Sequence, residues 1–497
     1  MKRSKHSLSH YNLLSCDMGE LVPVGLQEVL PGDTFQHATS VLARVSPLLA
    51  PVMHPVHVRL HHFFVPHRLV WDDWEDFITG GPDGEDDSSF PTITLTWSAG
   101  SPPTGTGVVG SLADYLGCPP GVNGLEVSAL PFRAYSLIYN EYYRDEDLIS
   151  PLTIDTSDGA DSTTNTDLQN VSWEKDYFTS ARPWTQKGPE VTIPLAGNAP
   201  VTSAATFSGT GVDNFMQVND TSGNPHDLVT SGGNLYGSGS ATGTAGVMYA
   251  DLDNVTAASI NDVRLAFALQ RYEEARARYG SRYTEYLRYL NVRSSDARLQ
   301  RPEYLGGGRQ TIQFSEVLQT SNDGTNGEVG ALAGHGITAV RSNRYRRFFE
   351  EHGYVVSLLS VLPKTMYVQA LHRTFNRRTK EDFWQKELEH IGQQEVLNKE
   401  VYAAHATPDG VFGYQDRYDE YRRTPSRVSG EFRESTLDFW HYGRKFGSDP
   451  ALNSSFVTSD PTDRVYAAST NDVLWLMCQH SIQARRLISA KGTSFTF

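Results

Sequence analysis

Two runs of alternating apolar and polar residues, both rich in β-branched side chains, restrict the first part of this chain to β-structure. The runs read DTFQHATSVLARV over residues 33–45 and VHVRLHHFFVP over residues 56–66. Successive side chains of a strand point to opposite faces, so this pattern predicts strands with one buried face. Prolines separate or end the runs, as expected because proline is tolerated at strand ends and edges: they are Pro47, Pro51, Pro55 and Pro66.

Most of the remaining sequence also indicates sheet. We expect strands over 91–98, 311–321, 354–363 and 366–375, and helices over 68–81, 130–148, 259–280, 281–291 and 379–392. The last helix would begin with Thr379 and Asp382 at the spacing of a capping box. Because no strand–helix–strand rhythm recurs, the expected fold class is mainly β, a large antiparallel sandwich with long loop insertions and a few short helices.

Composition excludes several classes of protein. The chain has 497 residues, and its 24 Tyr and 22 Phe are enough for a packed core. Cys16, Cys118 and Cys478 have no motif spacing, which argues against a disulfide framework and against a Cys-rich zinc site. No apolar run approaches the about 20 residues of a membrane span, and the basic N-terminus lacks the apolar core of a secretory signal. We therefore expect no membrane span and a reducing compartment.

Charge is distributed unevenly along the chain, whose net charge is −15. Residues 1–187 carry 11 cations and 24 acids, residues 188–263 carry seven acids and no Lys or Arg, and residues 264–497 carry 32 cations and 27 acids. The cation-free stretch is rich in Gly, Ser and Thr and would bury little surface. It is either a linker or plain surface loop, or a segment displayed on an outer surface. Nucleic-acid phosphates would repel it.

The catalytic and ligand motifs in the sequence are weak. Gly105, Gly107 and Gly110 spell a dinucleotide fingerprint, but two prolines precede it where the motif requires a strand. Asp83, Glu85, Asp86 and Asp87 lie on an acidic loop without the EF-hand pattern. No hydrolase, metalloprotease, kinase or P-loop signature occurs, and no spacing selects a pair of catalytic carboxylates. We therefore expect no enzyme activity, no metal and no cofactor.

Five histidines cluster within 14 residues. If residues 56–64 form a strand, His57, Arg59 and His61 share one face and His62 lies on the other. Three interpretations remain open: a metal site, a polar or intersubunit layer that titrates near neutral pH, or ordinary hydrogen-bonded histidines. The five are His54, His57, His61, His62 and His67.

Basic residues interleaved with aromatic ones recur in the last third and at both termini. Single-stranded nucleic acids are bound by this combination, because cations contact phosphates and rings stack on bases. Ion pairing with nearby acids is the alternative for each internal cluster, whereas the termini have few acidic neighbours. The candidate nucleic-acid-binding residues are Lys2, Arg3, Lys5, Arg341, Arg344, Arg346, Arg347, Arg373, Arg377, Arg378, Arg485, Arg486 and Lys491.

Several long motifs resemble one protein family. They are PVHVRLHHFFVPHRLVWDDWEDFITGG, LPFRAYSLIYNEYYRDEDL, PWTQKGP, SSDARLQRPEYLGGG and EHGYVVSLLSVLPKTMY. Together with the N-terminal segment they resemble the major capsid protein of the Microviridae, the small icosahedral single-stranded-DNA phages, and most closely its gokushovirus-like branch. The resemblance covers most of the chain in the same order, except for about 195–255.

The resemblance implies a viral eight-stranded antiparallel jelly roll whose copies form a T=1 shell around a circular single-stranded DNA genome. It also implies a surface insertion at the three-fold axes, where the cation-free stretch falls. Expected partners are further copies of the chain, DNA, a small DNA-binding protein, a pilot protein and a bacterial surface receptor. The expected locations are the virion and, during assembly, the host cytoplasm. The expected parts are a basic arm (1–25), jelly roll (26–187), insertion (188–258), jelly roll (259–475) and basic tail (476–497).

Two other function classes remain as alternatives. A carbohydrate-binding or carbohydrate-hydrolysing β-sandwich would need an acidic cleft, and a soluble DNA-binding module would bind DNA as an isolated subunit. The tyrosine-rich segments YNEYYRDEDL and FGYQDRYDEYRR are either subunit contacts or part of the core. The absence of a catalytic signature, the many loops and the segregation of charge favour the shell protein.

Overall fold

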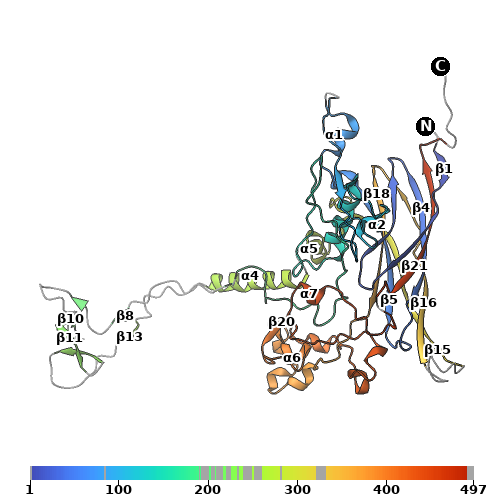
Figure 1. Cartoon of the computed structure of the whole chain (residues 1–497). Helices are drawn as coiled ribbons and strands as arrows, with labels where there is room; N and C mark the ends of the chain where they lie inside the picture. The colour runs from blue at the N-terminus through green and yellow to red at the C-terminus, as the bar shows by residue number, and fades with distance from the viewer. Residues whose placement is uncertain are drawn as a thin grey trace. The chain divides into compact units, whose positions relative to one another are not determined.

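The alternating runs of the sequence fold into two antiparallel sheets that face each other (Figure 1). The computed structural model describes residues 3–82, 85–189, 191, 260–279, 282–320, 332–468 and 470–489, and between 201 and 250 it describes only short strands. The larger sheet contains β1 (Ser4–Ser7), β2 (His10–Cys16), β4 (Thr34–Val45), β15 (Gln313–Leu318), β16 (Leu332–Arg341), β17 (Tyr345–Phe348) and β21 (Leu474–Arg486). The smaller sheet contains β3 (Val22–Val29), β5 (Val56–Pro66), β14 (Glu303–Thr311) and β18 (Gly353–Pro363).

The apolar faces of the two sheets pack against each other and form the main core. In β5, Val58 and Leu60 are fully buried, whereas His57, Arg59 and His61 are partly exposed, as the alternation predicts. Burial of such side chains stabilises a fold by about 1.5–3 kcal/mol each. Two packed antiparallel sheets confirm the mainly β, jelly-roll-like class. The core side chains include Val41, Ala43, Val45, Val56, Leu359, Val361, Leu474, Leu476 and Cys478.

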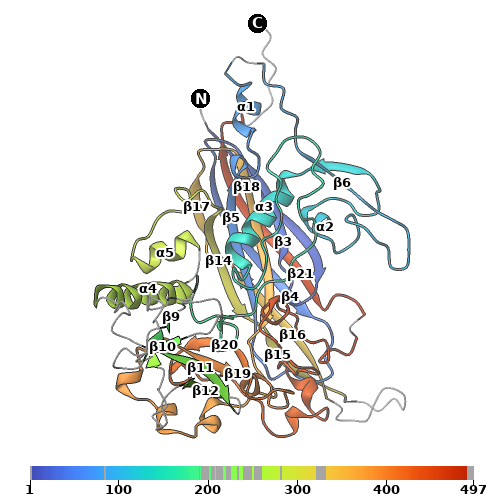
Figure 2. The ribbon, with the colours of Figure 1, turned by 90° about the vertical axis from the view of Figure 1, so that its left-hand side faces the viewer.

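Helix α3 (Leu130–Ile138) covers the other face of the smaller sheet (Figure 2). Leu130 and Phe132 of this helix join a second core with Phe63 of β5 and Leu358 of β18. The smaller sheet therefore has both faces covered, whereas none of the described helices lies on either face of the larger sheet. The other short elements are α1 (Trp74–Thr79), α2 (Leu112–Leu116), α5 (Tyr283–Tyr289), α6 (Asn398–Val401), α7 (Ser454–Val457), β6 (Thr92–Leu95), β7 (Leu125–Ser128), β19 (Gln393–Leu397) and β20 (Val411–Asp416).

Two expected elements are wrong. Residues 366–375 form no strand of a sheet; they make isolated bridges at Tyr367 and then the 3-10 helix η4 (Arg373–Asn376). Residues 379–392 form only two short 3-10 helices, η5 (Lys380–Asp382) and η6 (Lys386–Leu388). The backbone N–H groups of Trp384 and Gln385 donate to the hydroxyls of Tyr421 and Tyr418, which replace the carbonyl partners of an α-helix.

The chain divides into two compact units, one of residues 1–185 and 276–497 and one of residues 186–275. The second unit has the strands β8 (Val201–Thr202), β9 (Phe207–Ser208), β10 (Gln217–Asn219), β11 (Pro225–Ser231), β12 (Asn234–Ser238) and β13 (Tyr249–Ala250). Helix α4 (Ile260–Tyr279) crosses the boundary. The insertion expected at 188–258 falls in this unit and lies largely outside the described residues. Among the helices that are described, none has both the length and the apolarity to cross a bilayer.

A histidine cluster lies between the two sheets. His37 of β4 and His480 of β21 approach to 3.3 Å between ring nitrogens, and the His37 ring lies 4.6 Å from the His62 ring of β5. His480 Nε2 donates to the Val24 carbonyl over 2.9 Å. Their other described partners are the Thr39, Ser357 and Tyr345 hydroxyls and the stacked ring of His10. Gly25 permits this approach, because a Cβ there would lie 2.7 Å from the His480 ring.

Burial keeps these histidines neutral. It lowers the pKa of His480 to about 4 and, with the neighbouring His480 and His10 rings, lowers that of His37 to about 3. The pKa of His62 is also lowered well below its usual value, mainly by burial. A histidine whose folded pKa is depressed stabilises the fold above its unfolded pKa, and this stability is lost as the pH falls towards the folded value.

We therefore expect acid sensitivity. Between pH 6.5 and 4 the unfolded chain binds protons that the folded chain excludes, so His480 alone should reduce the free energy of unfolding by about 3 kcal/mol at pH 4. The melting temperature, measured by differential scanning fluorimetry at pH 7.5, 6, 5 and 4, should fall over this window. His480→Gln should flatten the fall. His335→Gln, which changes an exposed histidine of β16, is the control. An equal fall in His480→Gln and in the unmodified chain would contradict the explanation.

Candidate nucleic-acid interface

One face of the larger sheet is covered by no other element of the described part of the chain, and the strand register shows which side chains lie on it. Lys5 pairs with Arg485, Arg485 with Thr34, and Thr34 with Phe348. Directly paired residues point to the same side of an antiparallel sheet, and neighbouring strands lie about 4.8 Å apart. Because Phe35 and Ala484, one residue along, are buried in the core, the row from Lys5 to Phe348 points away from it. We call this side of the larger sheet the open face.

The open face carries cations from segments far apart in the sequence. Arg346 pairs with Gln36, and Arg341 pairs with Ser40. Arg44 lies on the same side, opposite Trp475. At the outward positions of the described strands there is no Asp or Glu. Asp472, which accepts a hydrogen bond from Ser15, lies just before β21 at the end of this face.

Large apolar and aromatic side chains lie between these cations. Tyr11 is 65% exposed, Leu13 78% and Trp475 49%, and the register places all three on the open face. At the other end, the Arg3 guanidinium lies 4.8 Å from the centre of the Phe348 ring. A surface that carries Arg, Lys and rings, with no acid at its strand positions, can neutralise phosphates and stack unpaired bases.

The structure brings together six of the candidates from the sequence. Arg3, Lys5, Arg341, Arg344, Arg346 and Arg485 are all exposed. Five of them lie on, or stack on, the open face through the register just described. Arg344 lies in the loop between β16 and β17. None of these six has an acidic partner among the described ion pairs.

Two other candidates in the same region are held by acids. The Arg347 guanidinium lies 2.7 Å from Glu303, and the Arg486 guanidinium lies 2.9 Å from the buried carboxylate of Asp33. Arg486 also donates to the Glu28 carbonyl over 2.6 Å. For Arg347 this is the intramolecular ion pair that the sequence left as the alternative. Arg486 belongs to a terminal cluster for which the sequence predicts few acidic neighbours, and its acid comes from a distant segment of the chain. Lys2 and Lys491 lie outside the described residues.

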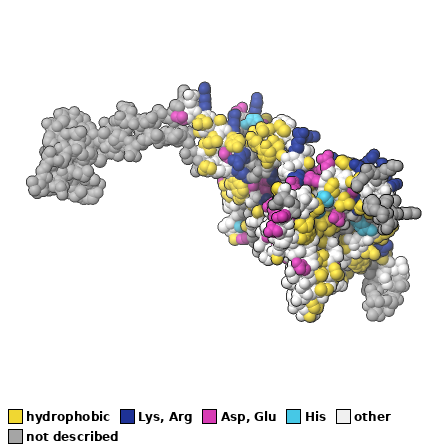
Figure 3. Space-filling model, turned by 90° about the horizontal axis from the view of Figure 1, so that it is seen from above, with side chains coloured by type: hydrophobic (Ala, Val, Ile, Leu, Met, Phe, Trp, Pro, Cys, Tyr) yellow, Lys and Arg dark blue, Asp and Glu magenta, His cyan; other side chains and the backbone are white. Residues whose placement is uncertain are grey.

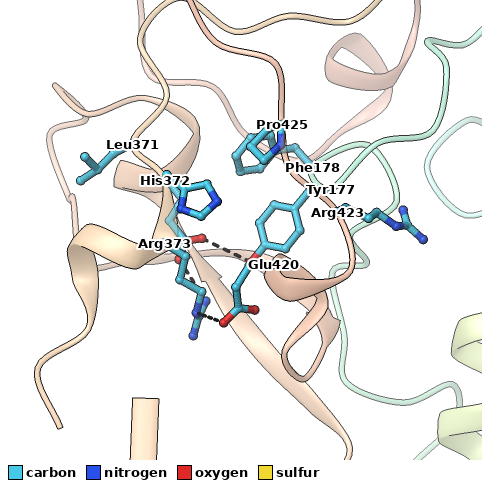
Figure 4. Close-up of a pocket in the computed structure, with 9 residues that line it drawn as sticks. Tyr177, Phe178, Leu371, His372, Arg373, Glu420, Arg423 and Pro425 are labelled. Carbon is cyan, nitrogen blue, oxygen red and sulfur yellow. Dashed lines mark hydrogen bonds and ion pairs between the residues drawn. The ribbon is translucent and has the colours of Figure 1, made fainter. Parts of the chain in front are cut away.

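The candidates near η4 form a separate, partly buried ionic cluster (Figure 4). Arg373 lies 3.0 Å from Glu400, and Arg377 lies 3.1 Å from Glu420. Tyr177 donates to Glu400 over 3.3 Å. Burial raises the pKa of Glu400 although Arg373 opposes it.

The cavity beside this ionic cluster has a volume of about 10 Å³, which is room for about one water molecule. The two carboxylates therefore have no space for a sugar ring, and the cluster holds loops together. Arg378 is exposed and donates to the backbone carbonyls of Phe375 and Arg377.

The five histidines of residues 54–67 do not converge. His54 bonds the Lys364 carbonyl, His57 the Thr311 hydroxyl, and His61 the Tyr143 hydroxyl, at 2.6, 3.1 and 2.7 Å. His62 belongs to the core cluster described above, and His67 packs against Trp74 and Tyr354. Within the described part of the chain, no three His, Cys, Asp or Glu side chains are placed to hold a metal.

Sequence reasoning missed Arg44, Tyr11 and Trp475. The signal was present, because Trp475, Met477, Gln479 and Arg485 occupy alternate positions that share one strand face. The cations at the end of segment 474–486 are its more conspicuous feature in the sequence. Arg44 is a lone cation in a strand whose pattern is dominated by its buried apolar face, so it has no basic neighbours that would indicate a cluster.

The matching family model describes capsid proteins, and three of the most similar relatives are all capsid proteins. The family model described as "Capsid protein (F protein)" matches residues 1–495. Capsid protein VP1 of Bdellovibrio phage phiMH2K is 38% identical over 95% of this chain and 90% of its own length. Capsid protein VP1 of Chlamydia phage 1 is 34% identical over 94% and 91%, and that of Spiroplasma virus 4 is 31% identical over 95% and 90%. The chain therefore belongs to the F-protein family of Microviridae major capsid proteins, on its gokushovirus-like branch.

Proposed function

We propose that copies of this chain form a T=1 shell around a circular single-stranded DNA genome, with the open face of the larger sheet turned towards the DNA. The observation that carries the proposal is the acid-free open face, with its cations Lys5, Arg44, Arg341, Arg346 and Arg485. Cations that neutralise phosphates release counterions, and this favours binding without base specificity.

The exposed aromatic rings make a second contribution to the free energy of DNA binding. Trp475 lies opposite Arg44, the Phe348 ring lies against the Arg3 guanidinium, and Tyr11 is exposed on the same face. Unpaired bases can therefore stack close to cations that neutralise the backbone. Each stacked base contributes about 1–3 kcal/mol in single-strand-binding proteins, with little sequence preference. A shell that encloses any genome of suitable length needs this sequence tolerance.

The remaining surfaces suit the DNA less well. The outer face of the smaller sheet is covered by α3, and residues 188–263 carry seven acids and no Lys or Arg. We infer that this stretch faces outward as a three-fold protrusion and contacts a bacterial surface receptor. A small DNA-binding protein and a pilot protein would complete the virion, which assembles in the host cytoplasm.

Neutralising the open face should weaken DNA binding without unfolding the subunit. In the variant Lys5→Gln, Arg346→Gln, Arg485→Gln, three phosphate contacts are lost. The slope of log K against log salt for single-stranded DNA should therefore become less negative by about 2, since each contact contributes about 0.7. DNA binding of dissociated subunits is measured by fluorescence anisotropy across salt concentrations. The filled fraction of particles from a density gradient should fall in parallel.

The matched control removes three exposed cations elsewhere, Lys380→Gln, Lys386→Gln and Arg427→Gln. This control should keep the salt slope and the filled fraction. Equal losses in both variants would show that net charge, and not the open face, controls DNA content.

Deleting residues 200–250 tests the outward insertion. Because these residues belong to the second compact unit, the two-sheet core should fold and shells should still close. Adsorption to host cells should fall at least about tenfold, as expected when a contact worth about 1.4 kcal/mol or more is lost. Sedimentation measures closure, and removal of particles from the medium by cells measures adsorption. Insoluble protein, or unchanged adsorption, would contradict the displayed-loop proposal.

A further inference from the structure

An acidic, partly apolar tip is formed by α1 and the residue before it. Asp73, Glu75 and Asp76 have no ion-pair partner in the part of the chain that the structure describes, and Phe77 and Ile78 are 38% and 49% exposed. Phe77 and Trp74 pack on the buried ring of Trp71, which fixes the tip to the core. We call Asp73–Thr79 the acidic tip. Figure 3, which looks down on this end, shows acidic side chains interspersed with hydrophobic ones.

A basic groove lies between α5 and the segment that follows it. The groove has a volume of about 630 Å³ and is lined by Leu287, Arg288, Val292, Arg293, Leu299 and Arg301, among others. Arg301 is held by Glu141 and Asp296. Arg288 and Arg293 are exposed and have no acidic partner among the described contacts.

The two surfaces complement each other in charge and in character. The groove offers unpaired guanidinium groups beside Leu287 and Val292, and the tip offers unpaired carboxylates beside Phe77 and Ile78. The volume of the groove lies within the range of about 300–1,000 Å³ typical of pockets that enclose a ligand. The groove can therefore admit the side chains of Phe77 and Ile78. Arg and aromatic residues are also the types that dominate the energetics of protein interfaces.

The chain cannot fill its own groove with its own tip. Both views of the ribbon show α1 at the upper end of the molecule and α5 well below it (Figures 1 and 2). The occupant must therefore come from another molecule, and a capsid protein is surrounded by copies of itself. Because tip and groove are different surfaces, each copy can present a free tip to the next copy, and such heterologous contacts close into rings when the rotation permits. The other arrangement is a two-fold pair in which each tip enters the other copy's groove.

We propose that the acidic tip of one copy docks into the basic groove beside α5 of a neighbouring copy, and that this contact closes a ring of subunits around a symmetry axis of the shell. The contact needs only self-assembly, so it is independent of the DNA-facing surface proposed above. It assigns the unpaired Arg288 and Arg293 to subunit recognition and not to the genome.

Reciprocal charge reversal tests the contact. Glu75→Lys with Asp76→Lys, and separately Arg288→Glu with Arg293→Glu, should each reduce the yield of closed shells at least about tenfold, because like charges then face each other across the interface. The four substitutions together should restore the yield to within about threefold of the unmodified chain, since the attraction returns with its direction reversed. Sedimentation separates shells from subunits.

The control pair Glu431→Lys with Glu434→Lys makes the same change in net charge as the tip variant, at exposed positions of η8 (Gly430–Arg433) and just after it. It should leave the yield unchanged. Unreduced yield in either charge-reversed pair, or no recovery when the two pairs are combined, would overturn the proposal.

Cross-linking gives a readout that does not depend on charge. Ile78→Cys and Val292→Cys in one chain place a thiol on the tip and another in the groove. Mild oxidation of assembled shells should produce a ladder of covalent oligomers on a non-reducing gel, ending at the number of copies in the ring. Uncross-linked chains would overturn the proposal, and so would dimers alone, because two chains whose tips each fill the other's groove form a closed pair and no ring.

Discussion

Burial of one face of each sheet is the constraint on which the rest of the structure depends. Val58 and Leu60 of β5 and Val41 and Ala43 of β4 fill the space between the sheets. Because side chains alternate along a strand, every buried position fixes its neighbours on the opposite face. The residues of the open face are therefore free of any packing requirement, and they can be Lys, Arg, Gln or Trp without cost to the core.

The core itself is not purely apolar. His37, His62 and His480 lie between the two sheets, and their hydrogen bonds to Thr39, Ser357, Tyr345 and the Val24 carbonyl satisfy most of their polar atoms. Unpaired buried polar groups are costly, so this network stabilises one arrangement of the two sheets over others. The same network makes the arrangement sensitive to protonation.

The sequence predicts the sandwich and its local faces well, because periodicity of two is a short-range property. It predicts that His57, Arg59 and His61 lie on one face of β5 and that Val58 and Leu60 lie on the opposite face. It fails at residues 366–392, where tyrosine hydroxyls from η7 (Asp419–Tyr421) and Tyr418, which precedes it, accept backbone N–H groups and prevent a helix. Such long-range partners leave no local signal. For the same reason the sequence does not show which arginines form ion pairs. Arg373 and Arg377 are neutralised by Glu400 and Glu420, which reach them through tertiary contacts.

Strand register, and not clustering along the chain, creates the cationic surface. Lys5, Arg485 and Arg346 come from three distant segments and meet because β1, β21, β4 and β17 are neighbours. Conversely, Arg346 and Arg347 are adjacent in sequence, yet only the first lies on the open face, while the second pairs with Glu303. A chain with a net charge of −15 can present an acid-free face only if alternation separates its charges in this way. The proposed contact with a polyanion therefore depends on the fold as a whole and cannot be transferred to any one of its basic segments.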